Sequence, residues 1–349
     1  MNNTAKRHAN IPIFIPHEGC PNGCVFCNQK KITGTHGLAG RDILPEIEAA
    51  LATIDPNVFE TEIAFFGGSF TGIDRSEMIR LLACAYGFVK AGRVSSIRLS
   101  TRPDYVNDEI LDILSEYGVR HIELGVQSAS DAVLSASKRG HTAECAKKAL
   151  KMIADRGFVA GGQMMIGLPG STLADELRTA KIICECGALE ARIYPTVVFY
   201  DTELCNMAKR GEYIPITTDD AAERAAKCYR VFLENRVKVL RVGLQSSENL
   251  SSENEVFAGA NHPALGELCE GRVYLDLVKD DVAKKLCTDG NTLVIEAPFG
   301  EISKVAGHKK ENKTALLQYL RNEQKTVENI KIIEKFDEKF RINTYFTDK

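Results

Sequence analysis

Three cysteines on one short segment restrict what this chain can fold into more than any other sequence feature does. Cys20, Cys24 and Cys27 have the spacing C-x3-C-x2-C, and no fourth cysteine follows nearby. Iron–sulfur clusters that only carry electrons normally use four cysteines. Three thiolates hold three irons of a four-iron cubane and leave the fourth iron open, so the spacing indicates a site of chemistry, as three-ligand zinc sites do. The alternatives are a Cys3His zinc site that uses His17, and three unrelated buried thiols.

Composition indicates a globular, soluble protein. The 349 residues are 44% hydrophobic and 26% charged, which is enough for one to three domains. No apolar run approaches the ~18 residues of a membrane span, and residues 1–8 lack the apolar core of a secretory signal. We therefore expect a cytoplasmic protein without membrane contact, in which the eight scattered cysteines are core residues. The net charge of −3 argues against indiscriminate nucleic-acid binding.

Strand-like and helix-like stretches alternate along the chain. Strands are predicted at 11–15, 62–66, 96–100, 120–124, 162–166 and 189–198, with one more at 237–242. Helices are predicted at 42–54, 75–89, 105–117, 142–156, 173–186 and 219–236. Six β/α units with short loops favour parallel crossovers. The expected fold is α/β, an incomplete (β/α)6 barrel of the TIM type over residues 10–245.

Unusual loops follow most of the predicted strands. The cysteines follow the first strand, Gly67-Gly68-Ser69-Phe70 the second and Ser100-Thr101-Arg102 the third. Gly125-Val126-Gln127 and Gly167-Leu168-Pro169-Gly170 follow the fourth and fifth. Each loop alone is compatible with simple turn chemistry. Since ligands bind at the carboxyl ends of parallel strands, five such loops on one rim indicate a ligand site.

These landmarks resemble the radical S-adenosylmethionine (SAM) superfamily over residues 10–245. The narrower resemblance is to the branch that holds the Elongator catalytic subunit and oxygen-independent coproporphyrinogen oxidase-like proteins. It is carried by Gly-Gly-Ser-Phe (67–70), Thr-Arg-Pro-Asp-Tyr (101–105), Glu-Leu-Gly-Val-Gln-Ser (123–128), Lys-Arg-Gly-His-Thr (138–142) and Met-Met-Ile-Gly-Leu-Pro-Gly (164–170). The Elongator subunit has a longer gap between its first two cysteines. It also has an acetyltransferase domain, for which the ~100 residues after the barrel are too few.

The resemblance implies roles for particular residues. Cys20, Cys24 and Cys27 would hold a [4Fe-4S] cluster whose open iron binds SAM, and Gly67, Gly68 and Ser69 would offer backbone to the SAM amino group. Many members have Gly-Gly-Glu where this chain has Gly-Gly-Ser, so that contact is backbone only.

Phe26 is expected to shield the cluster and contact adenine, or to anchor the loop. Further candidate cofactor-binding side chains at the strand ends are Ser100, Arg102, Glu123, Gln127 and Arg139. Arg139 suits the SAM carboxylate because guanidinium binds carboxylate in a bidentate way; the alternative for these side chains is a supporting or surface role. His141 is expected to cap a helix, and Tyr194 to reach substrate or fill the barrel.

A second unit is predicted over residues 246–349. It is a small α+β domain with strands at 293–298, 329–333 and 340–346, and a helix at 304–321 that carries His308, Lys309, Lys310, Lys313 and Arg321. Residues 259–267 read as a loop punctuated by glycine and proline. We expect this unit to cover the open side of the barrel. Its basic helix is either a solvated face or a phosphate- or RNA-binding surface.

The resemblance implies reductive cleavage of SAM to methionine and a 5′-deoxyadenosyl radical. Flavodoxin or ferredoxin would supply the electron, and no obligate protein partner is evident. The substrate is either tRNA or a small molecule such as a tetrapyrrole. A different class of function, a zinc-binding or electron-transfer module, remains open at this point.

Overall fold

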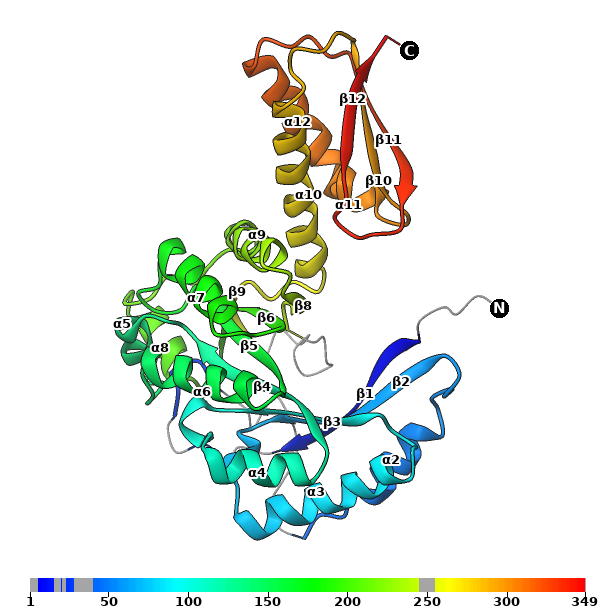
Figure 1. The fold of residues 1–349 in the computed structure, drawn as a ribbon. Helices are drawn as coiled ribbons and strands as arrows, with labels where there is room; N and C mark the ends of the chain where they lie inside the picture. Colours follow the sequence, from blue (N-terminus) through cyan, green and yellow to red (C-terminus); the bar gives the residue numbers. More distant parts are fainter. Residues whose placement is uncertain (1–5, 16–19, 21–22, 28–39, 245–254, 349) are drawn as a thin grey trace.

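A computed structural model describes residues 6–15, 20, 23–27, 40–244 and 255–348. Its main feature is a parallel sheet of seven strands in the order β1-β2-β3-β4-β5-β6-β8. The strands are β1 (Arg7–Ile15), β2 (Phe59–Gly67), β3 (Ser96–Thr101), β4 (Val119–Gln127), β5 (Val159–Ile166), β6 (Glu190–Pro195) and β8 (Lys238–Val242). The sheet curls into a half-barrel with helices on its convex side (Figure 1). The predicted fold class is therefore confirmed, including the seventh strand.

Each helix of the half-barrel joins one strand to the next. They are α2 (Leu44–Leu51), α3 (Arg75–Lys90), α4 (Asp108–Glu116), α6 (Ala143–Asp155), α7 (Leu173–Glu185) and α9 (Thr218–Glu234). Five of them begin at a side chain that accepts a hydrogen bond from the first turn: Asp74, Asn107, Thr142, Thr172 and Thr217. Such caps explain why these helices start where they do. Two short helices, α5 (Asp131–Ala136) and α8 (Glu203–Lys209), were not expected from the sequence.

The predicted strand 189–198 is wrong in its second half. The parallel ladder ends at Pro195, and β7 (Val197–Phe199) pairs antiparallel with β9 (Val256–Gly259) in a separate sheet. Thr196 explains the break, because its amide and its hydroxyl both donate to the Ile166 carbonyl, at 2.9 and 2.8 Å. The chain turns away from the half-barrel at that point.

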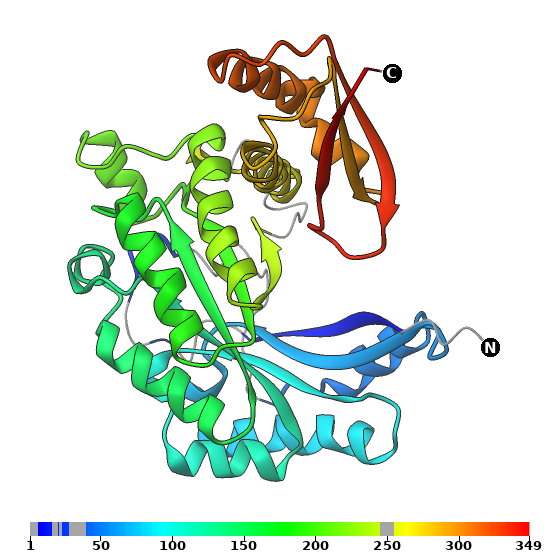
Figure 2. The same ribbon diagram turned by 45° about the horizontal axis from the view of Figure 1, so that its top comes forward.

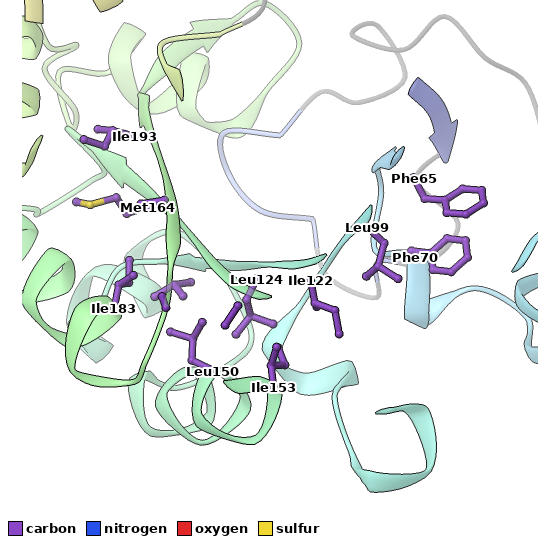
Figure 3. Packing of buried hydrophobic residues seen from close by; sticks show 14 of the residues in the cluster. Phe65, Phe70, Leu99, Ile122, Leu124, Leu150, Ile153, Met164, Ile183 and Ile193 are labelled. Atoms are coloured by element: carbon purple, nitrogen blue, oxygen red, sulfur yellow. The ribbon is translucent and has the colours of Figure 1, made fainter. Parts of the chain in front are cut away.

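The main core lies between the sheet and its helices. Figure 3 shows Ile122, Leu124, Leu150 and Ile153 packed together, with the stacked rings of Phe65 and Phe70, 4.4 Å apart, in the same cluster. Burying each of these side chains contributes about 1.5–3 kcal/mol. Because side chains alternate along a strand, the opposite face of the same strands points to the concave side. That face is polar, and it holds the site described below.

The C-terminal residues form a second, smaller unit. A sheet of three strands in the order β11-β10-β12 packs against α10 (Leu265–Ala283) and α12 (Glu311–Asn322). The strands are β10 (Thr292–Pro298), β11 (Asn329–Phe336) and β12 (Asn343–Thr347), with α11 (Ile302–Ala306) between β10 and α12. Figures 1 and 2 show that α10 joins this unit to the half-barrel. The N-terminal half of α10 contributes Leu265, Cys269 and Val273 to the main core, and its C-terminal half contributes to the second core.

The predicted basic helix 304–321 is not continuous. It breaks at Gly307, where φ is +78° and a Cβ would lie 2.7 Å from the Asn312 amide nitrogen, and Lys309 and Lys310 also have positive φ. Helix α10 was missed, so residues 265–267 are its first turn rather than a loop. The predicted boundary at 245/246 falls at residues outside the described ranges and stays a prediction. Within the described chain, no helix has the length and apolar character needed to cross a membrane.

Candidate active site

The cysteine segment is attached to the two short helices that the sequence did not predict. The Val25 amide donates to the Ser137 carbonyl at the end of α5, at 3.1 Å, and the Val25 carbonyl accepts from the Leu204 amide in α8, at 2.8 Å. Cys24 is buried, whereas Cys20 and Cys27 are half-buried. These contacts hold the cysteine segment at the carboxyl ends of the strands.

The sulfur of Cys20 faces the loop that follows β2. Burial raises the pKa of the Cys20 thiol, and the charges of Arg102 and Arg139 and a hydrogen bond from the Ser69 amide oppose that rise. The neighbouring Cys24 thiol also raises this pKa. Among the described residues, no group of three or more His, Cys, Asp and Glu side chains is gathered as a metal site. His17, the fourth ligand of the zinc alternative, lies outside the described ranges.

The glycine loop after β2 packs directly on the end of β1. At Gly67 φ is +106° and a Cβ would lie 2.6 Å from the Ile15 carbonyl oxygen, while the Gly68 amide donates to that same oxygen at 2.8 Å. Only glycine fits this close approach. The Ser69 hydroxyl bonds to Thr101 at 3.0 Å and accepts from the Arg102 amide at 3.2 Å. The Ser69 hydroxyl is therefore used within the protein.

Two buried arginines meet beside the cysteines. The Arg102 guanidinium pairs with Asp104 and donates to the Arg139 carbonyl at 2.8 Å. The Arg139 guanidinium donates to the Gly125 carbonyl at 2.9 Å and to His141 at 3.1 Å, and its Nη1 lies 3.6 Å from the Cys24 sulfur. In the described part of the chain, Arg139 has no carboxylate partner, and Nη1 of Arg102 is a buried donor without an acceptor.

Arg139 reaches Cys24 because residue 125 is a glycine. A Cβ at Gly125 would lie 2.6 Å from Nη2 of Arg139 and 3.1 Å from Nε2 of Gln127. The β4 ladder has an irregularity at this point, and Gln127 has φ +62°. The buried Oε1 of Gln127 has no partner among the described residues, so this oxygen is an unused hydrogen-bond acceptor.

Phe26 and His141 support the cysteine segment. Phe26 packs on two buried clusters, one that contains Met165 and Leu168 and one that contains Val25 and Leu204. His141 does not cap the helix, since Thr142 takes that position. Burial and the Arg139 charge lower the pKa of His141 to about 4. The imidazole is therefore neutral near pH 7.

The concave face of the half-barrel, here called the lumen, contains a cavity of about 790 Å³. Its lining includes Ser100 and Gly67 at one end, and a lining side chain, Gln163, donates to the Ser100 hydroxyl at 3.1 Å. The Glu123 carboxylate beneath it accepts from Arg98, Gln163 and Arg192, each at 2.9 Å. Ser100 is thus near open space, whereas Glu123 is occupied by its own partners.

An ion network that sequence reasoning missed fills the middle of the lumen. Arg98 binds Glu62, Glu123 and Glu190, at 3.1, 2.9 and 2.7 Å, and His8 and His121 join the same carboxylates. Burial alone would raise the pKa of Glu62, but hydrogen bonds from His8 and Ser96 and the Arg98 charge lower it to about 2. The sequence pattern that could have predicted this network is the alternation of charged and apolar residues along the strands, as in Glu62-Ile63 and Ile97-Arg98-Leu99.

Comparison with known proteins supports this arrangement. Residues 14–183 match the radical SAM superfamily, and residues 190–274 match the radical SAM C-terminal domain. The chain is 27% identical to the tRNA uridine(34) acetyltransferase of Methanocaldococcus jannaschii, over 62% of this chain and 47% of that protein. It is 31% identical to human Elongator complex protein 3, over 64% of this chain and 49% of that protein.

A solved structure is similar in fold. The archaeal Methanocaldococcus infernus Elp3 with an N-terminal deletion superposes with a TM-score of 0.61 at 22% identity, covering 79% of this chain and 64% of that one. The chain spans about half the length of these two curated relatives. Since both matched regions lie in order along one half-barrel and its extension, the chain belongs to the radical SAM superfamily, whose members bind a [4Fe-4S] cluster and SAM.

Proposed function

We propose that this chain reductively cleaves SAM at a [4Fe-4S] cluster held by Cys20, Cys24 and Cys27. One observation carries the proposal. Arg139 is 7% exposed and has no carboxylate partner among the described residues, yet it lies 3.6 Å from the Cys24 sulfur. A buried guanidinium is costly unless an anion accompanies it. Thiolate sulfur and the carboxylate of SAM are the anions that this family brings, and the pairing of Arg139 with Cys24 fits them.

Each of the remaining predicted residues has a proposed duty. Gln127 and Arg139 bind the polar groups of SAM, and the backbone of Gly67, Gly68 and Ser69 faces its amino group. Arg102 holds Arg139 in place through the Arg139 carbonyl and adds positive charge beside Cys20. Ser100 borders the cavity, which is proposed to take the nucleoside part of SAM. Glu123 acts indirectly, since its carboxylate holds Arg192 in the lumen.

Bound together, the two cofactors supply a 5′-deoxyadenosyl radical that abstracts a hydrogen atom from the substrate. The protein must exclude water and hold the reactants in contact. Phe26 suits the first duty because it packs on both the apolar cluster of Met165 and Leu168 and the cluster that includes Leu204 of α8. Flavodoxin or ferredoxin is the proposed electron donor. We place the reaction in the cytoplasm, where eleven free thiols stay reduced.

We propose tRNA as the substrate. Two observations support it. The matched methanogen protein is named as a tRNA uridine(34) acetyltransferase. The cavity in the lumen is lined by six Lys and Arg side chains but by three Glu side chains, so its wall carries an excess of positive charge. Residues 246–349 are proposed as a separate domain that shapes this specificity.

Anaerobic reconstitution with iron and sulfide, followed by dithionite and SAM, tests the cleavage reaction. Wild-type protein should bind about four irons and release 5′-deoxyadenosine. C24A should retain less iron and form only background product. C228A is the matched control, because Cys228 is a buried core thiol of α9 far from the cysteine segment in sequence. The proposal is wrong if the wild type makes no more 5′-deoxyadenosine than C24A, or if the purified protein holds zinc without iron or sulfide.

A further inference from the structure

A second group of cationic side chains lies on the lumen wall, on β6 and β8. Arg192 and Tyr194 come from β6 and Arg241 from β8, and all three line the cavity. Arg192 and Arg241 are direct partners in the parallel ladder, so their backbones are about 4.8 Å apart. Burial raises the pKa of Tyr194, and the charges of both arginines oppose that rise. Residues 192 and 194 share one face of β6, and Arg241 is the ladder partner of Arg192, so the phenol and the two guanidiniums lie on the same wall of the cavity.

These arginines are incompletely neutralised by the described residues. Glu123 forms a bidentate pair with Arg192, but the same carboxylate also accepts from Arg98. Arg241 forms no ion pair with any described residue, and its Nη1 lies 3.5 Å from the Leu244 carbonyl. Like charges side by side on a sheet are destabilising. An anion between them would remove that penalty.

We propose that Arg192, Arg241 and Tyr194 bind a phosphate group of a nucleotide substrate in the lumen. Guanidinium groups match phosphate oxygens in a bidentate way, and a phenol O–H supplies a further donor. Arg192 is pre-organised for this duty, because its other face stacks on Phe66, with 5.4 Å from the guanidinium carbon to the ring centroid. Tyr194 and Phe26 of the cysteine segment both pack on the buried cluster of Val133, Met165 and Leu168. A phosphate bound here would thus hold its nucleotide beside the reaction centre.

This inference rests on the proposed function, and UMP and uridine test it because they differ only by a phosphate. Binding to the anaerobically reconstituted full chain is measured by titration calorimetry. Wild-type protein should bind UMP about tenfold more tightly than uridine, the usual value of a charge-assisted hydrogen bond. R241Q should bring that ratio close to one, and R241K should restore part of it. K238Q should leave it unchanged, because Lys238 lines the cavity at the other end of β8.

Two results would overturn the inference. The first is equal affinity of the wild type for UMP and uridine. The second is an equal loss of UMP preference in K238Q and R241Q, because the preference would then come from the overall positive charge of the lumen rather than from this site. Iron content and melting temperature show whether R241Q is folded and loaded. The trinucleotide UpUpU identifies the source of the phosphate: Arg241-dependent binding of UpUpU indicates RNA, and Arg241-dependent binding of UMP alone indicates free nucleotides. A UMP preference without 5′-deoxyadenosine from the wild type would support this site and contradict the proposed reaction.

Discussion

Replacing Gly125 by alanine displaces Arg139 without removing its charge. The added Cβ would lie 2.6 Å from Nη2, whereas ordinary contact begins at 3.4 Å, so the guanidinium must move by about 0.8 Å. That movement breaks its 2.9 Å hydrogen bond to the residue 125 carbonyl. A hydrogen bond from a charged group is worth about 1.5–3 kcal/mol. We expect the free energy of unfolding to fall by about 1–2 kcal/mol, because the flexible side chain recovers part of the loss.

G125A should impair the reaction with SAM more strongly than it destabilises the fold. If Arg139 binds the SAM carboxylate, its displacement should raise the KM for SAM in 5′-deoxyadenosine formation about tenfold, since 1.4 kcal/mol corresponds to one decade. Urea unfolding and steady-state kinetics measure the two effects. G87A is the matched control: a Cβ there meets nothing within 4 Å on α3, and alanine should stabilise that helix by about 1 kcal/mol. Wild-type stability and KM in G125A would refute this account of how Arg139 is positioned.

Three further predictions follow from the site and its surroundings. G67A places a Cβ 2.6 Å from the Ile15 carbonyl oxygen at φ +106°, so it should cost about 2–3 kcal/mol of unfolding free energy and reduce iron content; unchanged urea midpoints would contradict this. Because the pKa of His141 falls from 6.5 to about 4 on folding, stability is complete above pH 6.5 and is lost as pH falls towards 4, by about 2 kcal/mol at pH 5. H141Q should remove that loss. The prediction is wrong if the unfolding free energies of H141Q and the wild type fall equally between pH 6.5 and pH 5. Charge reversal at exposed Lys309 and Lys310 should weaken tRNA binding and flatten its salt dependence, whereas unaltered affinity would make this turn a solvated surface. Lys313 is left intact in that test because its Nζ donates to the Ile330 carbonyl at 2.9 Å.

Much of the fold could be predicted because its signals are local. Apolar periodicity and side-chain caps mark the six helices of the half-barrel, and short apolar runs mark its strands. The predictions were wrong where a distant contact overrides the local pattern. Strand 189–198 breaks because Thr196 bonds to Ile166, thirty residues earlier. Helix 304–321 breaks at Gly307, where Asn312 bonds to carbonyls of α10 and α11.

The sequence by itself determined which chemical groups this protein can use: three thiols on one segment, a glycine loop, and polar residues at the strand ends. Those are covalent facts, and parallel crossovers bring strand ends to one rim whatever the details of packing. Only the tertiary structure decided how these groups are paired. It left Arg139 beside Cys24 without a carboxylate, occupied Glu123 with three partners, and placed Arg192 next to Arg241. Such pairings depend on register and curvature across strands far apart in the chain, and no local pattern encodes them.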